Sequence, residues 1–304
     1  MPIHNTLPTV VISNFAEAHV DFLGRLADPK EREDLINSEA YHADRTLLWA
    51  GDPKLLFVTY PIAHADWLTG ALGYPGTRHM VPEQPSDFLC KDILREAPLM
   101  QAIVDYAGPQ RTIQIIPYAT TPELYELVDA LRQQKRLTVL LPECPLPENL
   151  WVRDYVDTKA GFRLLASTWL ADADRMLPPG IVCHSREQAA SVAHWFCRRG
   201  DTCVLKADTG ESGIGFEVLT PDNHCELGET IKTLHKNFFF SDEPILVEKY
   251  IHAERQLSPS PEVFVPPLGE GDPFIMYPTQ QLFQKFGDFC GILVSKEQFS
   301  QPWY

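Results

Sequence analysis

The stretch that decides the fold is Val204-Leu205-Lys206-Ala207-Asp208-Thr209-Gly210-Glu211-Ser212-Gly213-Ile214-Gly215. An apolar strand reaches a lysine and is followed by a loop with three glycines and two hydroxyl side chains. Glycine lets the backbone approach phosphate oxygens closely, and hydroxyls donate further hydrogen bonds. Lys206 adds a point charge suited to an α- or β-phosphate. The stretch predicts a phosphate-covering loop, and the competing interpretation is a plain hairpin with a glycine-rich turn.

The residues after the glycines exclude two common nucleotide-binding loops. No Gly-Lys-Ser/Thr follows them, so the stretch is not a P-loop. Residues 216–219 (Phe-Glu-Val-Leu) have the character of a strand. No helix N-terminus is therefore offered to a pyrophosphate, and the stretch is not a Rossmann loop either.

Three further segments flank this hairpin at wide spacing. Asp157-Thr158-Lys159 precedes it, at the start of a helix predicted for residues 155–167, and Pro178-Pro179-Gly180 follows that helix. Leu246-Val247-Glu248-Lys249-Tyr250-Ile251 comes after the hairpin, in a strand predicted for residues 244–250. In this order and spacing, the segments resemble the nucleotide-binding half of the ATP-grasp superfamily.

The resemblance implies an ATP site. Lys159 and Lys206 would neutralise phosphate charge, and the loop at residues 209–215 would close over the phosphates. Residues 247–251 would hold adenine through backbone hydrogen bonds, and Glu254 would bind the ribose. The residues assigned to the site are Lys159, Lys206, Thr209, Gly210, Ser212, Gly213, Gly215, Glu248, Lys249, Tyr250, Ile251 and Glu254.

Taken alone, each of these residues has a plainer interpretation. Lys159 is compatible with a solvated lysine on a helix, and Lys206 with an edge strand. Glu248 and Lys249 are compatible with an exposed strand end, and Glu254 with a weak surface ion pair. The assignment rests on their joint order.

The first half of the chain has the pattern of an open α/β sheet. Residues 54–60, 112–116 and 137–141 are apolar or β-branched runs, which predict buried strands. Thr121, followed by proline, predicts the N-terminus of a helix between the last two strands. We also expect one helix over residues 85–106.

The two prolines of residues 144–149 mark a domain boundary. We expect an α/β N-terminal, pre-ATP-grasp domain at residues 1–150, followed by an α+β ATP-grasp core. The core would consist of the lid and nucleotide-binding subdomain at residues 151–250 and the start of the C-terminal subdomain at residues 251–304. The C-terminal part is expected to be incomplete.

The magnesium ligands of the family are the main departure. ATP-grasp enzymes hold Mg²⁺ with an acidic residue on a late strand and a Glu-x-Asn pair beyond it. No Glu-x-Asn pair occurs after Glu248. Glu262 and Glu270 lie too early in the chain to be the acidic metal ligand, and Asp288 has no Glu-x-Asn partner. We therefore expect the chain to end before the metal site is complete. No residue is assigned as a metal ligand or as catalytic.

Residues 258–294 resemble a branch of the superfamily with peptide ligases of the pheganomycin peptide ligase type. This implies an ATP-dependent ligase that joins a small-molecule carboxylate to an amine through an acyl phosphate, or an ATP-binding fragment of one. The alternative is a non-catalytic nucleotide-binding or regulatory protein that lost the metal site. A third interpretation is an α/β interaction protein with a fortuitous hairpin.

Composition restricts the other classes of function. The 304 residues carry 26 Lys+Arg against 41 Asp+Glu, a net charge of −15, which argues against nucleic-acid binding. No signal peptide is visible, and no apolar run reaches the ~18 residues of a membrane span. The seven cysteines are scattered, as in a reducing compartment. We expect a cytoplasmic protein without a membrane partner, and a homodimer is left open.

Overall fold

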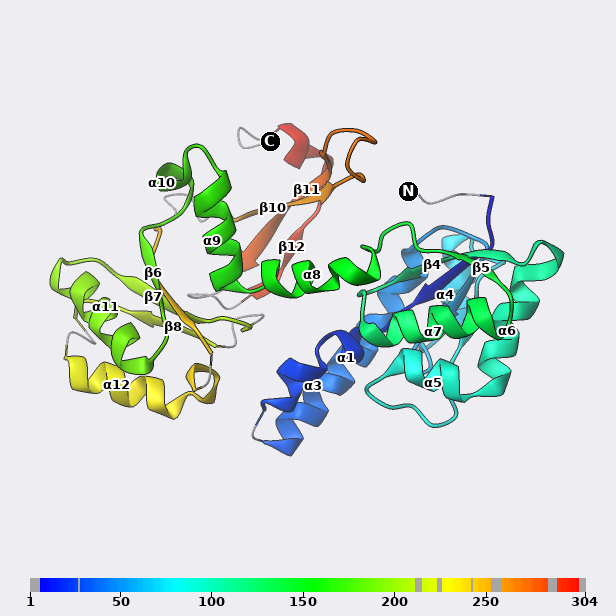
Figure 1. The fold of residues 1–304 in the computed structure, drawn as a ribbon, viewed down its shortest axis with the longest axis horizontal. Helices are drawn as coiled ribbons and strands as arrows, with labels where there is room; N and C mark the ends of the chain where they lie inside the picture. Colours follow the sequence, from blue (N-terminus) through cyan, green and yellow to red (C-terminus); the bar gives the residue numbers. More distant parts are fainter. Residues whose placement is uncertain are drawn as a thin grey trace. The chain divides into compact units, whose positions relative to one another are not determined.

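The computed structural model describes residues 6–26, 28–210, 215–222, 226–241, 243–252, 258–283 and 289–300. The chain forms two compact units, Met1–Leu150 (unit 1) and Trp151–Tyr304 (unit 2), which are described separately (Figure 1). In the described parts of both units, no helix has the length and apolar character that crossing a bilayer requires.

Unit 1 is built on a five-stranded parallel sheet with the strand order β3-β2-β1-β4-β5. The strands are β1 (Thr9–Ile12), β2 (Lys54–Phe57), β3 (Arg78–Met80), β4 (Thr112–Pro117) and β5 (Thr138–Leu140). The chain adds strands on one side of β1 and then on the other, so the winding direction reverses between β1 and β4. In such sheets, ligands bind beyond the carboxyl ends of the strands at this reversal.

Helices cover both faces of this sheet. They are α1 (Phe15–Ala18), α2 (Val20–Gly24), α3 (Pro29–His42), η1 (Ala43–Leu48), α4 (Ala65–Leu72), α5 (Leu89–Arg95), α6 (Ala97–Ala107), η2 (Gly108–Gln110), α7 (Pro122–Gln133) and, beyond β5, η3 (Pro147–Asn149). Because side chains alternate along a strand, Val10 and Ile12 pack with α5, α6 and α7, whereas Val11 packs with η1 and α4. Burial on both faces explains the continuous apolar runs of the strands.

Most sequence predictions for unit 1 are confirmed. Strands occur where residues 54–60, 112–116 and 137–141 predict them. Thr121 caps α7, since its hydroxyl accepts a hydrogen bond from the Leu124 N–H at 3.2 Å. The single helix predicted for residues 85–106 is wrong. Two helices form instead, because Pro98 has no N–H to continue the helical ladder and Glu96 is extended (φ −95°, ψ 106°).

Unit 2 contains two antiparallel sheets, ordered β6-β9-β7-β8 and β10-β11-β12. The strands are β6 (Gly180–Cys183), β7 (Cys203–Ala207), β8 (Phe216–Leu219), β9 (Ile245–Lys249), β10 (Pro259–Phe264), β11 (Phe274–Phe283) and β12 (Phe289–Leu293). The helices are α8 (Leu150–Val156), α9 (Lys159–Trp169), α10 (Ala173–Met176), α11 (Arg186–Arg198), α12 (Leu227–Lys236), η4 (Phe238–Phe240) and η5 (Lys296–Ser300).

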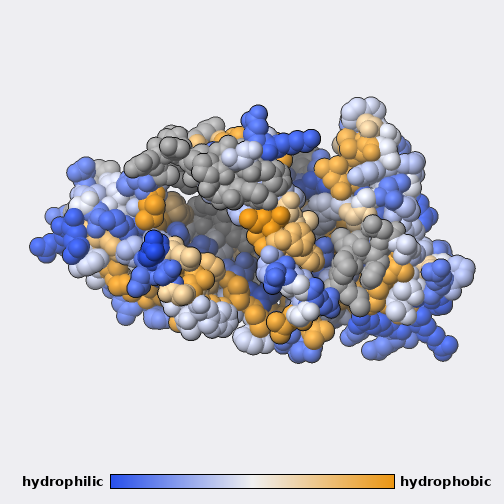
Figure 2. All heavy atoms as spheres, turned by 90° about the horizontal axis from the view of Figure 1, so that it is seen from above, coloured by the Kyte–Doolittle hydropathy of each residue, from blue (hydrophilic) through white to orange (hydrophobic). Residues whose placement is uncertain are grey.

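One face of the four-stranded sheet is buried under α11 and α12, around Leu205 and Val247. Apolar side chains also reach the surface of the molecule, as the orange areas of Figure 2 show on the visible face. Those of the three-stranded sheet include Phe274 and Ile292, which are 56% and 53% exposed. The described parts of this second sheet thus bury little apolar surface within unit 2.

The single helix predicted for residues 155–167 is also wrong, whereas the strands predicted at residues 216–219 and 244–250 are confirmed. The chain breaks between α8 and α9, where the Thr158 hydroxyl accepts a hydrogen bond from the Gly161 N–H at 2.9 Å and begins a new helix. A Cβ on Gly161 would lie 2.0 Å from the Tyr155 carbonyl oxygen. The break therefore requires glycine at this position.

Lys54 is a fully buried lysine at the start of β2. Its Nζ donates to the carbonyl oxygens of Leu47 and Gly51, at 2.5 and 2.8 Å, and lies 4.6 Å from the centre of the Tyr74 ring. These contacts tie the segment at residues 47–51 to the sheet. Burial lowers the pKa of Lys54 to about 8, against the attraction of nearby Asp52.

This lowered pKa predicts that Lys54 makes stability rise with pH. Between pH 8 and 10.5 the unfolded chain holds a proton on Lys54 that the folded chain has released, so the free energy of unfolding increases across that window. Lys54→Met removes this contribution. The stability of the wild type relative to Lys54→Met, measured by urea unfolding, should therefore increase from about pH 7.5 to about pH 10. A constant difference would contradict the lowered pKa.

Candidate functional site

Side chains alternate between the two faces of the sheet along β7 and β9, so that one face is apolar and the other is polar. Leu205 and Val247 point into the core under α11 and α12, so Lys206 and Glu248 lie on the opposite face. In the antiparallel register Val204 is paired with Glu248. Lys206, two residues further along β7, is therefore the diagonal neighbour of the Glu248 carboxylate.

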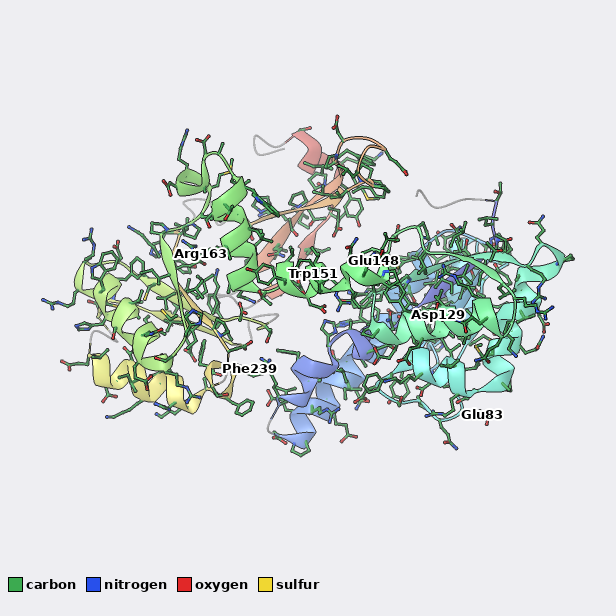
Figure 3. All side chains as sticks on the ribbon, viewed as in Figure 1. Glu83, Asp129, Glu148, Trp151, Arg163 and Phe239 are labelled. Carbon is green, nitrogen blue, oxygen red and sulfur yellow. The ribbon has the colours of Figure 1, made fainter. Side chains whose placement is uncertain are left out.

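On this face a buried carboxylate is shared by two cations. The Lys206 Nζ lies 2.8 Å from Glu248 Oε2, and Nη1 of Arg163, labelled on α9 in Figure 3, lies 2.5 Å from Glu248 Oε1. The Glu248 side chain is 6% exposed, against 16% for Arg163 and 30% for Lys206. A carboxylate this deeply buried requires charged partners. Lys206 is the more exposed of the two partners.

The second nitrogen of Arg163 fixes the start of β6. Its Nη2 donates to the carbonyl oxygens of Pro178 and Gly180, at 2.9 and 3.1 Å. Gly180 is paired with Glu248 across the sheet, and a Cβ on it would lie 2.6 Å from Glu248 Cγ. The proline-containing segment of the sequence prediction is thus held beside the carboxylate, with the planar guanidinium as the common partner.

The amino end of α9 is bound to the loop that follows β7. The N–H groups of Lys159 and Ala160 donate to the Asp208 carbonyl and carboxylate, at 3.1 and 2.7 Å, and a carboxylate is favourable at this helix end. Burial raises the pKa of Asp208, and the hydrogen bond from Ala160 opposes the rise. The Lys159 Nζ donates to the carbonyl oxygen of Gly210.

Both ends of the glycine-rich loop are anchored. The N–H and hydroxyl of Thr209 donate to the Glu243 carboxylate, at 3.1 and 2.8 Å. At the other end, the Gly215 carbonyl accepts from the Ala207 N–H at 2.7 Å. Gly215 has φ +72°, and a Cβ on it would lie 2.8 Å from the Ala207 Cβ. Of the predicted site residues, Ser212, Gly213 and Glu254 lie outside the described residues.

The predicted adenine hinge is the end of β9 and the two residues after it. The N–H groups of Lys249 and Tyr250 already donate to the carbonyl oxygens of Pro179 and Thr202, at 2.8 and 2.9 Å. The Lys249 Nζ pairs with a carboxylate oxygen of Asp201 at 2.7 Å. Ile251 is 62% exposed, and within the described residues its N–H makes no hydrogen bond.

The structure thus brings Lys206 and Glu248 together, and the side chain of Lys159, on α9, contacts the glycine-rich loop. Arg163, Asp208 and Glu243 were missed by the sequence analysis. Arg163 follows Lys159 by four residues, a helical spacing that places both on one face of α9. That spacing was a readable signal. The roles of Asp208 and Glu243 depend on contacts between distant segments, which no local pattern reports.

Metal-ligating side chains are not gathered in the described ranges. Among those residues, no group of three or more His, Cys, Asp or Glu side chains is placed to hold a metal ion. Asp208 and Glu243, whose carboxylates contact α9 and the loop, accept hydrogen bonds from backbone N–H groups.

Comparison with known proteins finds no matching family profile and no matching curated protein. Among solved structures, the chain is similar to biotin carboxylase from Campylobacter jejuni, a β-γ-ATP complex, with 16% identity and a TM-score of 0.49 over 97% of this chain and 57% of that one. The N5-carboxyaminoimidazole synthetase from Staphylococcus aureus, complexed with ADP, has 10% identity and a TM-score of 0.48 over 97% and 60%.

A third similar structure is a RimK domain ATP-grasp protein from Sphaerobacter thermophilus, with 16% identity and a TM-score of 0.36 over 74% of this chain and 71% of that one. The present chain spans less than two thirds of the length of the biotin carboxylase and of the synthetase.

Arg163→Met tests whether Glu248 needs both cations. The variant keeps an apolar side chain of similar reach but removes the ion pair and the bonds to two carbonyl groups. Because it leaves a buried charge with one partner fewer, we expect a loss of about 3–5 kcal/mol of unfolding free energy, measured by urea unfolding of the full chain.

The matched control is Arg198→Met, which removes an exposed arginine of α11 and should change stability by less than about 0.5 kcal/mol. A double-mutant cycle of Arg163→Met with Glu248→Gln should give a coupling of about 0.5–3 kcal/mol. Equal effects of Arg163→Met and Arg198→Met, or zero coupling, would show that the ion pair is not structural.

Proposed function

We propose that unit 2 binds ATP in the manner of ATP-grasp enzymes and that the chain is an ATP-dependent carboxylate–amine ligase or the nucleotide-binding part of one. The observation that carries this proposal is the ion pair between Lys206 and the buried Glu248. Lys206 is part-exposed and faces away from the core, and Glu248 has Arg163 as a second charged partner.

Charge supports a phosphate at this place. Arg163 and Lys206 pair with one deeply buried carboxylate, Glu248, and Lys159 lies one helical turn from Arg163 on α9, in a chain whose net charge is −15. A triphosphate that displaces Glu248 from Lys206 gains a charge-assisted bond, while the Arg163 pair continues to compensate the carboxylate. Lys159 reaches the same phosphates from the loop by exchanging the Gly210 carbonyl for a phosphate oxygen.

The adenine would lie along the segment after β9. The exposed Ile251 offers its backbone N–H, and a purine ring nitrogen is a suitable acceptor. Lys249 and Tyr250 hold this segment on its neighbours through their own N–H groups, so its geometry is set before a ligand arrives. We assign Glu254, Ser212 and Gly213 to the ribose and the phosphates as a further part of the proposal.

The reaction would proceed in two displacements. A carboxylate oxygen of the substrate attacks the γ-phosphorus, the bond from that phosphorus to the bridging oxygen breaks, and ADP leaves. The amine nitrogen then attacks the acyl carbon, the bond from carbon to the phosphate oxygen breaks, phosphate leaves, and the nitrogen loses its proton. Lys159 and Lys206 would neutralise the charge, and the loop at residues 209–215 would exclude water from the acyl phosphate.

The Mg²⁺ of the family does not fit the described residues, among which no cluster of three ligating side chains is present. No step is therefore assigned to a protein-bound metal. In this proposal unit 1 is the pre-ATP-grasp domain. Release of ADP that requires both a carboxylate and an amine would distinguish the ligase from a nucleotide-binding protein without this chemistry.

Lys206→Ala tests the phosphate assignment. Loss of one charge-assisted contact should weaken ATP binding at least about tenfold, equivalent to ~1.4 kcal/mol, as measured by titration calorimetry. The control is Lys232→Ala, which removes an equally charged lysine of α12 that is 68% exposed and paired with Glu229. Unchanged ATP affinity in Lys206→Ala, or an equal loss in Lys232→Ala, would refute the assignment.

A further inference from the structure

A group of polar and aromatic side chains lies at the carboxyl edge of the unit 1 sheet, where the winding direction reverses between β1 and β4. Here the crevice between the two strands is closed by the protein itself. The Asn14 side chain donates to the Ala119 carbonyl at 3.0 Å and accepts from the Ala119 N–H at 3.1 Å. The loops that leave β1 and β4 are therefore joined directly after the strands end.

A buried carboxylate lies at this edge of the sheet, next to the crevice. Glu17, 4% exposed, accepts hydrogen bonds from the Cys90 N–H at 2.8 Å, from the Asn14 side chain at 3.0 Å and from the Thr121 hydroxyl. Cys90 and Thr121 lie at the amino ends of α5 and α7. The amino end of a helix is a common binding site for an anion. A ligand at this edge must therefore lie beside the crevice and not in it.

Beside the crevice lies a stack of aromatic rings with an arginine over it. Phe15, between Asn14 and Glu17, stacks on Tyr118 with ring centres 3.6 Å apart, and Trp49 lies 6.2 Å from Tyr118 at an interplanar angle of 18°. The Arg45 guanidinium carbon lies 4.4 Å from the centre of Phe15 and 5.8 Å from that of Tyr118.

Arg45 is positioned by these rings and not by an acid. It is exposed, and within the described residues no carboxylate pairs with it and no hydrogen bond engages its donors. The cation–π contacts restrict its orientation, and Lys54 holds the segment that follows it on the sheet. A planar, pre-oriented guanidinium matches the two oxygens of a carboxylate.

We propose that this edge of unit 1 binds a carboxylate with a flat apolar body. The carboxylate lies on the Arg45 fork, and the apolar body lies along Trp49 and Tyr118. One guanidinium balances one carboxylate charge, whereas a phosphate dianion requires further cations. This site is separate from the proposed nucleotide site and uses none of its residues. A test of one site is therefore independent of the other.

Benzoate is the probe, and the indole N–H signals of the six tryptophans in the full chain are the readout by NMR. Trp49→Phe identifies the Trp49 signal. Benzoate at about millimolar concentration should shift that signal in a saturable way. Arg45→Gln should weaken the response at least about tenfold, and Arg45→Lys, which keeps the charge but loses the fork, by less.

The control variant is Arg78→Gln. Arg78 is also exposed and stacked, 5.4 Å from the Tyr106 ring, but it stands at the amino end of β3, on the opposite edge of the sheet. It should leave benzoate binding unchanged, and neutral benzamide should not bind. Binding that survives Arg45→Gln, equal binding of benzamide, tighter binding of phenyl phosphate, or no response of the wild type would each overturn the proposal.

Discussion

The shared ion pair of Glu248 with Arg163 and Lys206 joins parts of unit 2 that are 85 and 42 residues away from Glu248 in the sequence. Since an unpaired buried carboxylate is unstable, β7, β9 and α9 can pack in this way only while a cation stays paired with Glu248. Arg163 extends the constraint to β6 through two carbonyl groups. The same interaction leaves Lys206 partly exposed, and in the proposed function this lysine is the cation that binds a phosphate.

Polar side chains lie at a different part of the sheet in each unit. In unit 1 both faces are buried by helices, so polar groups collect at the carboxyl edge, where Asn14, Glu17 and Arg45 lie close to the strand ends. In unit 2 helices α11 and α12 cover one face of the four-stranded sheet. The opposite face therefore carries the charged side chains of β7 and β9, and a site for phosphate can be built on the strands themselves.

Local patterns predicted the elements that depend on local physics. Apolar runs located the strands, and Thr121 marked a helix start because its hydroxyl caps the next turn. The two helix predictions that are wrong fail for local reasons as well, namely Pro98 and the helix cap at Thr158. Hydrophobic periodicity alone does not report either of them. The contacts of Glu17 with Cys90 and of Thr209 with Glu243 join distant segments, so no pattern along the chain contains them.

The central claim is that Lys159 and Lys206 hold the phosphates of ATP while the segment ending at Ile251 holds its base. Titration calorimetry of the unmodified chain with ATP, adenosine and inorganic triphosphate tests it most directly. ATP should bind at one site per chain, more tightly than either fragment, with an affinity that falls as salt is added. Absence of ATP binding, or adenosine binding as tightly as ATP, would contradict the claim.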